Sequence, residues 1–236
     1  MTHTAVIAGV GPGLGASLAH RFGAEGCQVG LLARSPDYIE MLADDVTVDT
    51  AGTGLAVQTD ITDRDQVASA FESIRDAYGS VDILVNHASD APWDGVDIDP
   101  DAFERSLTVG PMGSLHCTQQ VVPDMLDGDG GTIIFTGATS AVRGRGGALG
   151  FSAAKFATRG MAESLARELG PEGIHVAHAV IDGQIATPGA LETAGDRDRE
   201  AFLDPDAIAD SYWHLVEQNR SSWTLELDLR PHVEEF

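Results

Sequence analysis

The stretch Ala8-Gly9-Val10-Gly11-Pro12-Gly13-Leu14-Gly15 places four glycines at alternate positions close to the N-terminus. It follows an apolar run at residues 5–8 and precedes a segment of helical composition. Glycine lets the backbone turn tightly between a strand and a helix, and it lets a phosphate group approach the chain closely. The free N–H groups at the start of the helix then attract that anion. The stretch therefore predicts a phosphate-binding turn between the first strand and the first helix of an α/β domain.

Short apolar runs alternate with helical patterns along the rest of the chain. The runs expected to form buried strands are residues 29–32, 55–57, 83–85, 133–135 and 176–181, followed by an alternating run at 223–229. Nearly continuous apolar strands separated by helices are typical of a parallel sheet covered on both faces. We expect one domain spanning residues 1–236, a doubly wound three-layer α/β sandwich with a mostly parallel sheet of about seven strands. The longest irregular stretch, residues 182–204, is predicted to be a lid over a site.

Acidic side chains dominate the composition. The chain has 37 acidic residues against 14 basic ones, and its formal net charge is -23. Such a charge repels nucleic acid and anionic membranes, so neither is expected as a partner. The acids are spread along the chain, and Lys155 is the only lysine. This pattern favours adaptation to high cytoplasmic salt, which screens the repulsion, over an ordinary acidic protein.

Other bulk features point to a cytoplasmic protein. No apolar stretch reaches the length of a membrane-spanning helix, and no basic flank precedes a signal-like segment at the N-terminus. The two cysteines, Cys27 and Cys117, are far apart, which is typical of a reducing compartment. No group of His, Cys or Asp residues has the spacing of a metal site, so no metal is expected.

The end of the second strand indicates which dinucleotide the turn would bind. Proteins of this architecture that prefer NAD carry a carboxylate there to accept hydrogen bonds from the adenosine ribose. Here the sequence reads Ala33-Arg34-Ser35. An arginine pairs well with the 2′-phosphate of NADP, so we predict NADP(H), with NAD as the other possibility. The alternative interpretation is a solvated arginine at a strand end.

The spacing Gly9-x-x-x-Gly13-x-Gly15 resembles the loop of the short-chain dehydrogenase/reductase family, which has a Rossmann-type fold. The resemblance extends from residue 4 to about residue 188. It includes Asn86-His87-Ala88-Ser89, similar to the family's Asn-Asn-Ala-Gly, and Asp182-Gly183-Gln184-Ile185-Ala186-Thr187, similar to Pro-Gly-x-x-x-Thr. The cofactor-binding residues implied by the resemblance, together with those derived above, are Gly9, Gly11, Gly13, Leu14, Gly15, Arg34, Ser35, Asp60, Ile61, Asn86, Ala88, Lys155, Gly183, Ile185 and Thr187.

The family's catalytic residues are where this chain departs from the resemblance. The family uses an asparagine, a serine, a tyrosine and a lysine. The matching positions here are Gly110, Ala138, Phe151 and Lys155. Phenylalanine has no proton to exchange with a substrate oxygen, so the usual mechanism cannot run. The placement of the only lysine at the ribose-binding position nevertheless favours a retained cofactor site.

Several side chains are candidates to replace the missing acid. They are His87, Thr139, Ser140 and Ser152. His87 is the speculative first choice, because histidine titrates near neutrality and this one follows the fourth strand, where ligands bind. Its alternative role is structural. Ser152-x-x-Lys155 also has the spacing of an acyl-enzyme motif, but no strand runs directly into it, which disfavours that chemistry.

Two arginines belong to the loop that borders the substrate pocket in the family. Arg143 and Arg145 could hold an anionic substrate or pair with local carboxylates.

Two functions follow from these patterns. The first is an NADP(H)-dependent oxidoreductase that transfers hydride to or from a carbonyl, an alcohol or a related small molecule by a non-standard proton path. The second is a non-catalytic dinucleotide-binding sensor or scaffold. The resemblance also implies a homodimer or homotetramer.

Overall fold

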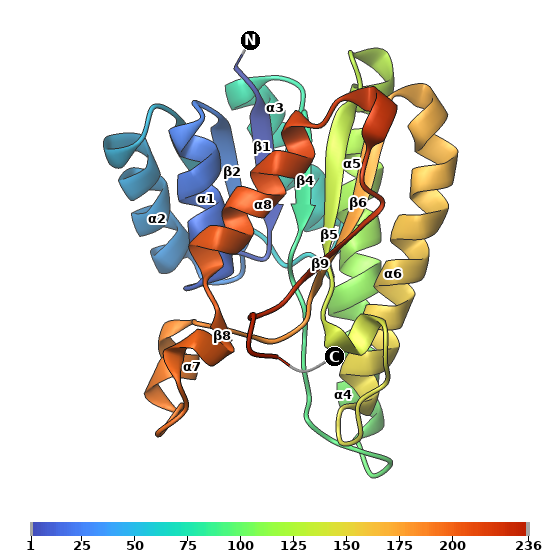
Figure 1. Cartoon of the computed structure of the whole chain (residues 1–236). Helices are drawn as coiled ribbons and strands as arrows, with labels where there is room; N and C mark the ends of the chain where they lie inside the picture. The colour runs from blue at the N-terminus through green and yellow to red at the C-terminus, as the bar shows by residue number, and fades with distance from the viewer. Residues whose placement is uncertain (1, 235–236) are drawn as a thin grey trace.

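A single parallel sheet organises the molecule, as the computed structural model shows for residues 2–234 (Figure 1). Its seven strands follow the order β3-β2-β1-β4-β5-β6-β9, and every neighbouring pair is parallel. The strands are β1 (Thr4–Ala8), β2 (Gln28–Ala33), β3 (Thr53–Gln58), β4 (Ile83–Asn86), β5 (Gly131–Thr136), β6 (Ile174–Ile181) and β9 (Glu226–Leu229). The predicted doubly wound α/β fold is confirmed, with all of the expected strands present.

Helices cover both faces of this sheet and bury two apolar cores. The main helices are α1 (Leu14–Ala24), α2 (Pro36–Asp49), α3 (Arg64–Tyr78), α5 (Gly113–Asp127), α6 (Leu149–Leu169) and α8 (Pro205–Glu217). On one face α1, α2 and α8 pack together, with the Phe22 and Trp213 rings edge to face at 5.6 Å. On the other face α3, α5 and α6 bury Phe71 and Ile74. None of the helices within residues 2–234 is long and apolar enough to cross a membrane.

The strand order creates a switch point between β1 and β4. The chain leaves β1 toward α1 on one face, and it leaves β4 toward the other face. In open α/β sheets the loops diverge at such a point, and the crevice between them binds ligands at the carboxyl ends of the strands. A ligand-binding site is therefore expected between the glycine turn after β1 and the segment that follows Asn86.

A π-helical turn interrupts the helix that follows β4. Helix α4 (Pro100–Leu107) continues through the turn Thr108–Met112 into α5. Pro111 lies inside this turn and lacks the N–H that an α-helix would use. The widened turn carries Gly110, whose added Cβ would lie 3.4 Å from the Ala154 side chain on α6. The bulge thus places the position of the family's asparagine against α6.

The segment 182–204 is more ordered than its sequence suggests. We expected an irregular lid, but the chain forms β7 (Gln184–Ile185), α7 (Pro188–Glu192) and β8 (Phe202–Leu203). Strands β7 and β8 pair in parallel as a separate two-stranded sheet. These elements are too short to leave a periodic pattern in the sequence, which is why the expectation of an irregular segment was wrong; its role as a lid stays a prediction.

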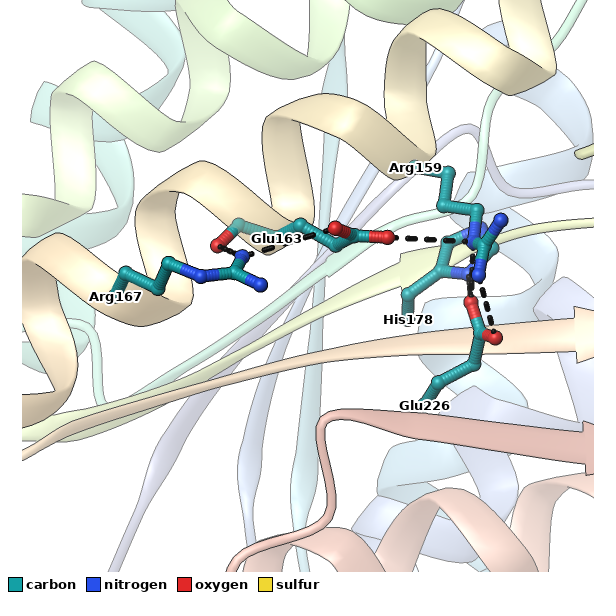
Figure 2. A network of polar contacts seen from close by, with 5 residues as sticks. All are labelled: Arg159, Glu163, Arg167, His178 and Glu226. Atoms are coloured by element: carbon teal, nitrogen blue, oxygen red, sulfur yellow. Dashed lines mark hydrogen bonds and ion pairs between the residues drawn. The ribbon is translucent and has the colours of Figure 1, made fainter.

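A polar network ties the edge strand β9 to α6 and β6 (Figure 2). Glu226 accepts hydrogen bonds from Arg159 at 2.6 and 3.0 Å, and it lies 3.1 Å from Nδ1 of the buried His178. Although burial opposes it, the hydrogen bonds from Arg159 and His178 hold the pKa of Glu226 below its ordinary value. Glu163 links Arg159 to Arg167 along the same helix. His178 therefore has a structural partner and is remote from the glycine turn.

Candidate functional site

A cavity of about 860 Å³ opens at the carboxyl ends of the strands, between the turns that follow β1, β2, β3 and β4. Most residues predicted to bind a dinucleotide line it: Gly9, Gly11, Leu14, Gly15, Arg34, Ser35, Asp60, Ile61, Ala88, Ile185 and Thr187. His87 lines it as well. Sequence reasoning thus located one continuous cavity from segments that lie more than a hundred residues apart.

The glycines of the first turn have two different roles. Gly9 has φ 98°, and a Cβ there would lie 2.5 Å from Ala88. Gly13 has φ 122°, and its Cβ would lie 2.6 Å from the Thr187 methyl carbon. These two glycines let the turn pack against neighbouring segments. Around Gly11, by contrast, no atom of residues 2–234 other than its two chain neighbours lies within 4 Å of an added Cβ, so its backbone faces open space.

The start of α1 completes this end of the cavity. Gly13 is the N-cap, and no side chain caps the helix. No acidic side chain lies in its first turn either. The N–H groups of Leu14 and Gly15 are therefore available to an anion in the cavity, whereas that of Ala16 is bonded to the Gly11 carbonyl at 3.2 Å. The helix dipole favours negative charge there.

A second polar end of the cavity is formed after β2. Arg34 is exposed, and its guanidinium makes no ion pair or hydrogen bond within residues 2–234, while its carbonyl accepts from Gln58. Ser35 occupies the N-cap position of α2, but its hydroxyl does not cap the helix. Both side chains are thus free to bind a ligand. Asp37 lies in the first turn of α2.

Four predicted cofactor residues do not line the cavity. Gly13 contacts Thr187, as described above. Asn86 is buried at the end of β4 and donates to the Thr118 hydroxyl at 3.2 Å. Gly183 packs against Pro231 and Leu203. Lys155 lies in the interior.

Lys155 is buried and does not line the cavity. Its Nζ donates to the Thr136 carbonyl at 2.7 Å, and the side chain is only 6% exposed. Burial lowers the pKa of its ammonium group to about 8. One hydrogen bond leaves further donor capacity on Nζ. Lys155 is not among the residues that line this cavity, so its contact with a ribose stays a prediction.

Phe151 and Lys155 lie four residues apart on one face of α6. The Lys155 Nζ lies 5.6 Å from the centre of the Phe151 ring. Trp93 packs on the same ring, with the centroids 5.9 Å apart. Ala138 has an extended backbone at the N-cap of a short 3₁₀ turn, Thr139–Ala141, which packs against α6. The positions of the family's four catalytic residues thus gather around α6, but three of them carry no polar group.

His87 does not titrate where we expected. Burial, with a smaller contribution from the charge of Lys155, lowers its pKa to about 4. The ring is therefore neutral at pH 7 and cannot serve as an imidazolium acid. A neutral imidazole can still donate one hydrogen bond and accept another. Its Nδ1 lies 3.3 Å from the Thr136 hydroxyl.

Arg143 and Arg145 both contact other side chains of the protein. Arg143 lies 3.3 Å from the buried carboxylate of Asp182, which also accepts from the Thr139 hydroxyl at 2.6 Å. Arg145 stacks over Trp93 at 5.1 Å. Pairing with local carboxylates was the second of our two interpretations. It describes Arg143, whereas Arg145 packs on an aromatic ring instead. The Ser152 hydroxyl is also occupied, since it accepts from the Arg145 backbone.

Sequence reasoning missed one wall of the cavity. Helix α4 and the turn after it contribute Asp101, Glu104, Arg105, Thr108 and Val109. Asp101, Glu104 and Arg105 have the spacing of one helix face. Predicting a helix at residues 100–107 would therefore have placed these three side chains together. Tyr38, one turn after Arg34, was missed too. Within residues 2–234, no group of three or more His, Cys, Asp or Glu side chains is placed to hold a metal ion.

The cavity, its glycine turn and the uncapped helix define an α/β protein of the dinucleotide-binding class. The model of the short chain dehydrogenase family matches residues 3–199. A short-chain type dehydrogenase/reductase of Sinorhizobium fredii is 32% identical over 201 residues, which cover 82% of this chain and 77% of that protein. The chain belongs to the short-chain dehydrogenase/reductase family, whose members are NAD(P)-dependent oxidoreductases. Membership favours an enzyme over the sensor or scaffold.

Solved structures agree with this assignment. A short-chain dehydrogenase of Rhodopseudomonas palustris superposes with a TM-score of 0.84 at 28% identity, over 98% of this chain and 99% of that one. L-Sorbose reductase of Gluconobacter frateurii, solved with NADPH and L-sorbose, superposes with a TM-score of 0.89 at 23% identity, over 98% and 95% of the two chains. At 23% identity, the likeness to L-sorbose reductase shows a shared fold only.

Proposed function

We propose that this protein is an NADP(H)-dependent oxidoreductase that interconverts a carbonyl compound and an alcohol. The observation that carries the proposal is the cavity with two anion-binding ends. One end is the open backbone at Gly11 with the uncapped start of α1. The other holds the Arg34 guanidinium and the Ser35 hydroxyl, neither of which has a side-chain partner in the described chain. A pyrophosphate fits the first end and a 2′-phosphate fits the second.

The residues around the cavity have distinct tasks in this proposal. Gly11, Leu14 and Gly15 hold the pyrophosphate, while Arg34 and Ser35 hold the 2′-phosphate. Asp60 and Ile61 border the adenine, and Ile185 and Thr187 border the nicotinamide. When bound, the cofactor supplies a hydride to the carbonyl carbon. Lys155 adds positive charge beneath the nicotinamide ribose, because its ammonium is protonated below about pH 8.

The proton path differs from the family's because Phe151 replaces the tyrosine. In the direction of reduction, one carbonyl and one hydride give an alkoxide, which needs one proton to become the alcohol. We propose that His87 donates a hydrogen bond to that oxygen from the cavity wall and that water in the open cavity supplies the proton. General acid–base catalysis is worth roughly 10²–10⁴ in rate, so a path without tyrosine should be slow.

Turnover of NADPH with a panel of aldehydes, ketones and quinones tests this function, with Gly11→Leu as the blocking variant. Because no atom lies within 4 Å of a Cβ at Gly11, the variant should fold with an unchanged melting temperature. Its side chain would fill the space of the pyrophosphate, so NADPH binding measured by calorimetry should disappear. Gly144→Leu is the matched control, since Gly144 is equally unobstructed but does not line the cavity. Normal NADPH binding by Gly11→Leu would place the cofactor elsewhere.

The acidic composition leads to a prediction about salt. With a formal net charge of -23, repulsion between carboxylates opposes the compact state. Molar KCl shortens the screening length to about 3 Å and should relieve this repulsion. We expect the melting temperature, measured by calorimetry, to rise steadily from low salt to molar KCl. A melting temperature that stays flat over that range would contradict the proposed adaptation to concentrated salt.

A further inference from the structure

Thr136, the last residue of β5, is the centre of a buried polar chain. Its carbonyl accepts from Lys155 at 2.7 Å. Its hydroxyl lies 3.0 Å from the Tyr212 hydroxyl and 3.3 Å from His87 Nδ1. Tyr212, on α8, is fully buried, and Thr136 is 5% exposed. One strand end therefore connects the retained lysine, a histidine on the cavity wall and a phenol on the opposite face of the sheet.

The directions of these hydrogen bonds follow from the donors available. The Tyr212 hydroxyl has no partner besides Thr136 within residues 2–234, so its single proton must be donated to the Thr136 oxygen. The Thr136 proton is then left for His87 Nδ1. The reverse direction would leave the buried phenol proton without an acceptor, which costs about 1–3 kcal/mol. The favoured arrangement makes Nδ1 an acceptor.

The other ring nitrogen of His87 then carries the proton. Nε2 has no hydrogen-bond partner within residues 2–234, and it is not among the buried unpartnered atoms of that part of the chain. Because the ring lines the cavity, this nitrogen is the one available to a ligand. Burial and the nearby charge of Lys155 keep the ring neutral, so it carries one N–H rather than two.

We propose that Thr136 and Tyr212 are positioning residues that hold His87 as the Nε2–H tautomer, which donates a hydrogen bond to the carbonyl oxygen of the substrate. The inference rests on the proposed oxidoreductase function. A neutral imidazole N–H aimed at an oxygen that gains negative charge stabilises the transition state without first having to be protonated. The chain thereby obtains part of what a tyrosine would supply at position 151.

Nitrogen NMR of the imidazole rings tests the tautomer directly. In protein labelled with ¹⁵N-histidine and studied at pH 7 in molar KCl, the signals of His87 are assigned by their loss in His87→Gln. We expect a neutral ring with its proton on Nε2. Thr136→Val removes the hydroxyl but keeps the carbonyl that binds Lys155, and it should shift the population toward Nδ1–H. Tyr212→Phe should do the same in part, because Thr136 can then accept from Nδ1.

Matched substitutions separate this effect from a general disturbance of the fold. Thr132→Val lies on the same strand and is also buried, and Tyr78→Phe removes a phenol outside the cavity. Neither should change the His87 signals. In kinetic measurements with whichever substrate is turned over, Thr136→Val should lower kcat by at least about tenfold, which is a small part of the rate contribution of general acid–base catalysis. KM for NADPH should stay unchanged.

The outcomes are distinct. A proton on Nδ1, or an imidazolium at pH 7, in the unmodified protein overturns the inference. So does an Nε2–H tautomer whose loss in Thr136→Val leaves kcat unchanged. If NADPH binds but no substrate turns over, the proposed function fails, and with it the donation to a substrate. The NMR result then still decides whether Thr136 and Tyr212 set the tautomer.

Discussion

Replacing Arg34 with alanine is expected to weaken NADPH binding by about tenfold to a hundredfold while leaving the affinity for NADH unchanged. The guanidinium lines the cavity without a partner in the described chain, so the 2′-phosphate would be its first strong ligand. A hydrogen-bonded charge pair of this kind is worth about 1.5–3 kcal/mol. The unmodified protein should therefore prefer NADPH. Titration calorimetry with both cofactors, in molar KCl to screen the acidic surface, measures the two affinities.

A control separates the local contact from the overall charge. Arg167→Ala removes the same charge from the far turn of α6, where Arg167 lies near Glu163 (Figure 2). It should leave both affinities unchanged. Equal affinity of the unmodified protein for NADPH and NADH would refute the predicted preference. A loss of affinity for both cofactors in Arg34→Ala would instead mean that Arg34 shapes the cavity without reading the phosphate.

The end of the cavity that holds the glycine turn and Arg34 was predictable because its signals are local. The glycine turn lies directly between β1 and α1, and Arg34 lies directly after β2. Strands buried on both faces leave continuous apolar runs, so the sheet could be inferred as well. The carboxyl ends of parallel strands meet at one edge, which is why Asp60 and Ala88 could be assigned to the same cavity.

The end of the cavity near His87 was less predictable, because the properties of its side chains depend on burial and on residues far away in the sequence. The sequence shows that His87 follows a strand, but its pKa is set by desolvation and by Lys155, which lies 68 positions later in the chain. The hydroxyl of Thr136 accepts from Tyr212, which lies 76 residues away in the sequence. Helix α4 was missed because it is short. Such features arise from packing between segments that are far apart in the chain, so they produce no recognisable residue spacing in the sequence.

The second large effect is expected from restoring the family's catalytic residues. The triple variant Phe151→Tyr, Ala138→Ser, Gly110→Asn should raise NADPH-dependent reduction of carbonyl compounds by at least tenfold, a conservative part of the acid–base contribution of roughly 10²–10⁴. The new phenol would extend from a ring whose centre lies 5.6 Å from the Lys155 Nζ. That positive charge would lower the pKa of the phenol and ready it for proton exchange.

The backbone at the other two positions accepts the new side chains. Ala138 is extended, with φ -159° and ψ 171°, so serine needs no unusual conformation. Gly110 does not have a positive φ, and its Cβ would make an ordinary contact of 3.4 Å with Ala154. Asparagine is thus free of the strain that a left-handed glycine would impose. The π-helical turn already places this position against α6.

Two controls make the result specific. Phe156→Tyr adds a phenol to an exposed position on the same helix and should leave the rate unchanged. Lys155→Met in the triple background should cancel the gain, because the tyrosine then lacks the neighbouring positive charge. A folded triple variant that binds NADPH and reduces nothing on a broad panel would favour the non-catalytic sensor. A substantial rate in the unmodified protein would instead agree with hydrogen-bond donation from His87, and His87→Ala should then lower that rate.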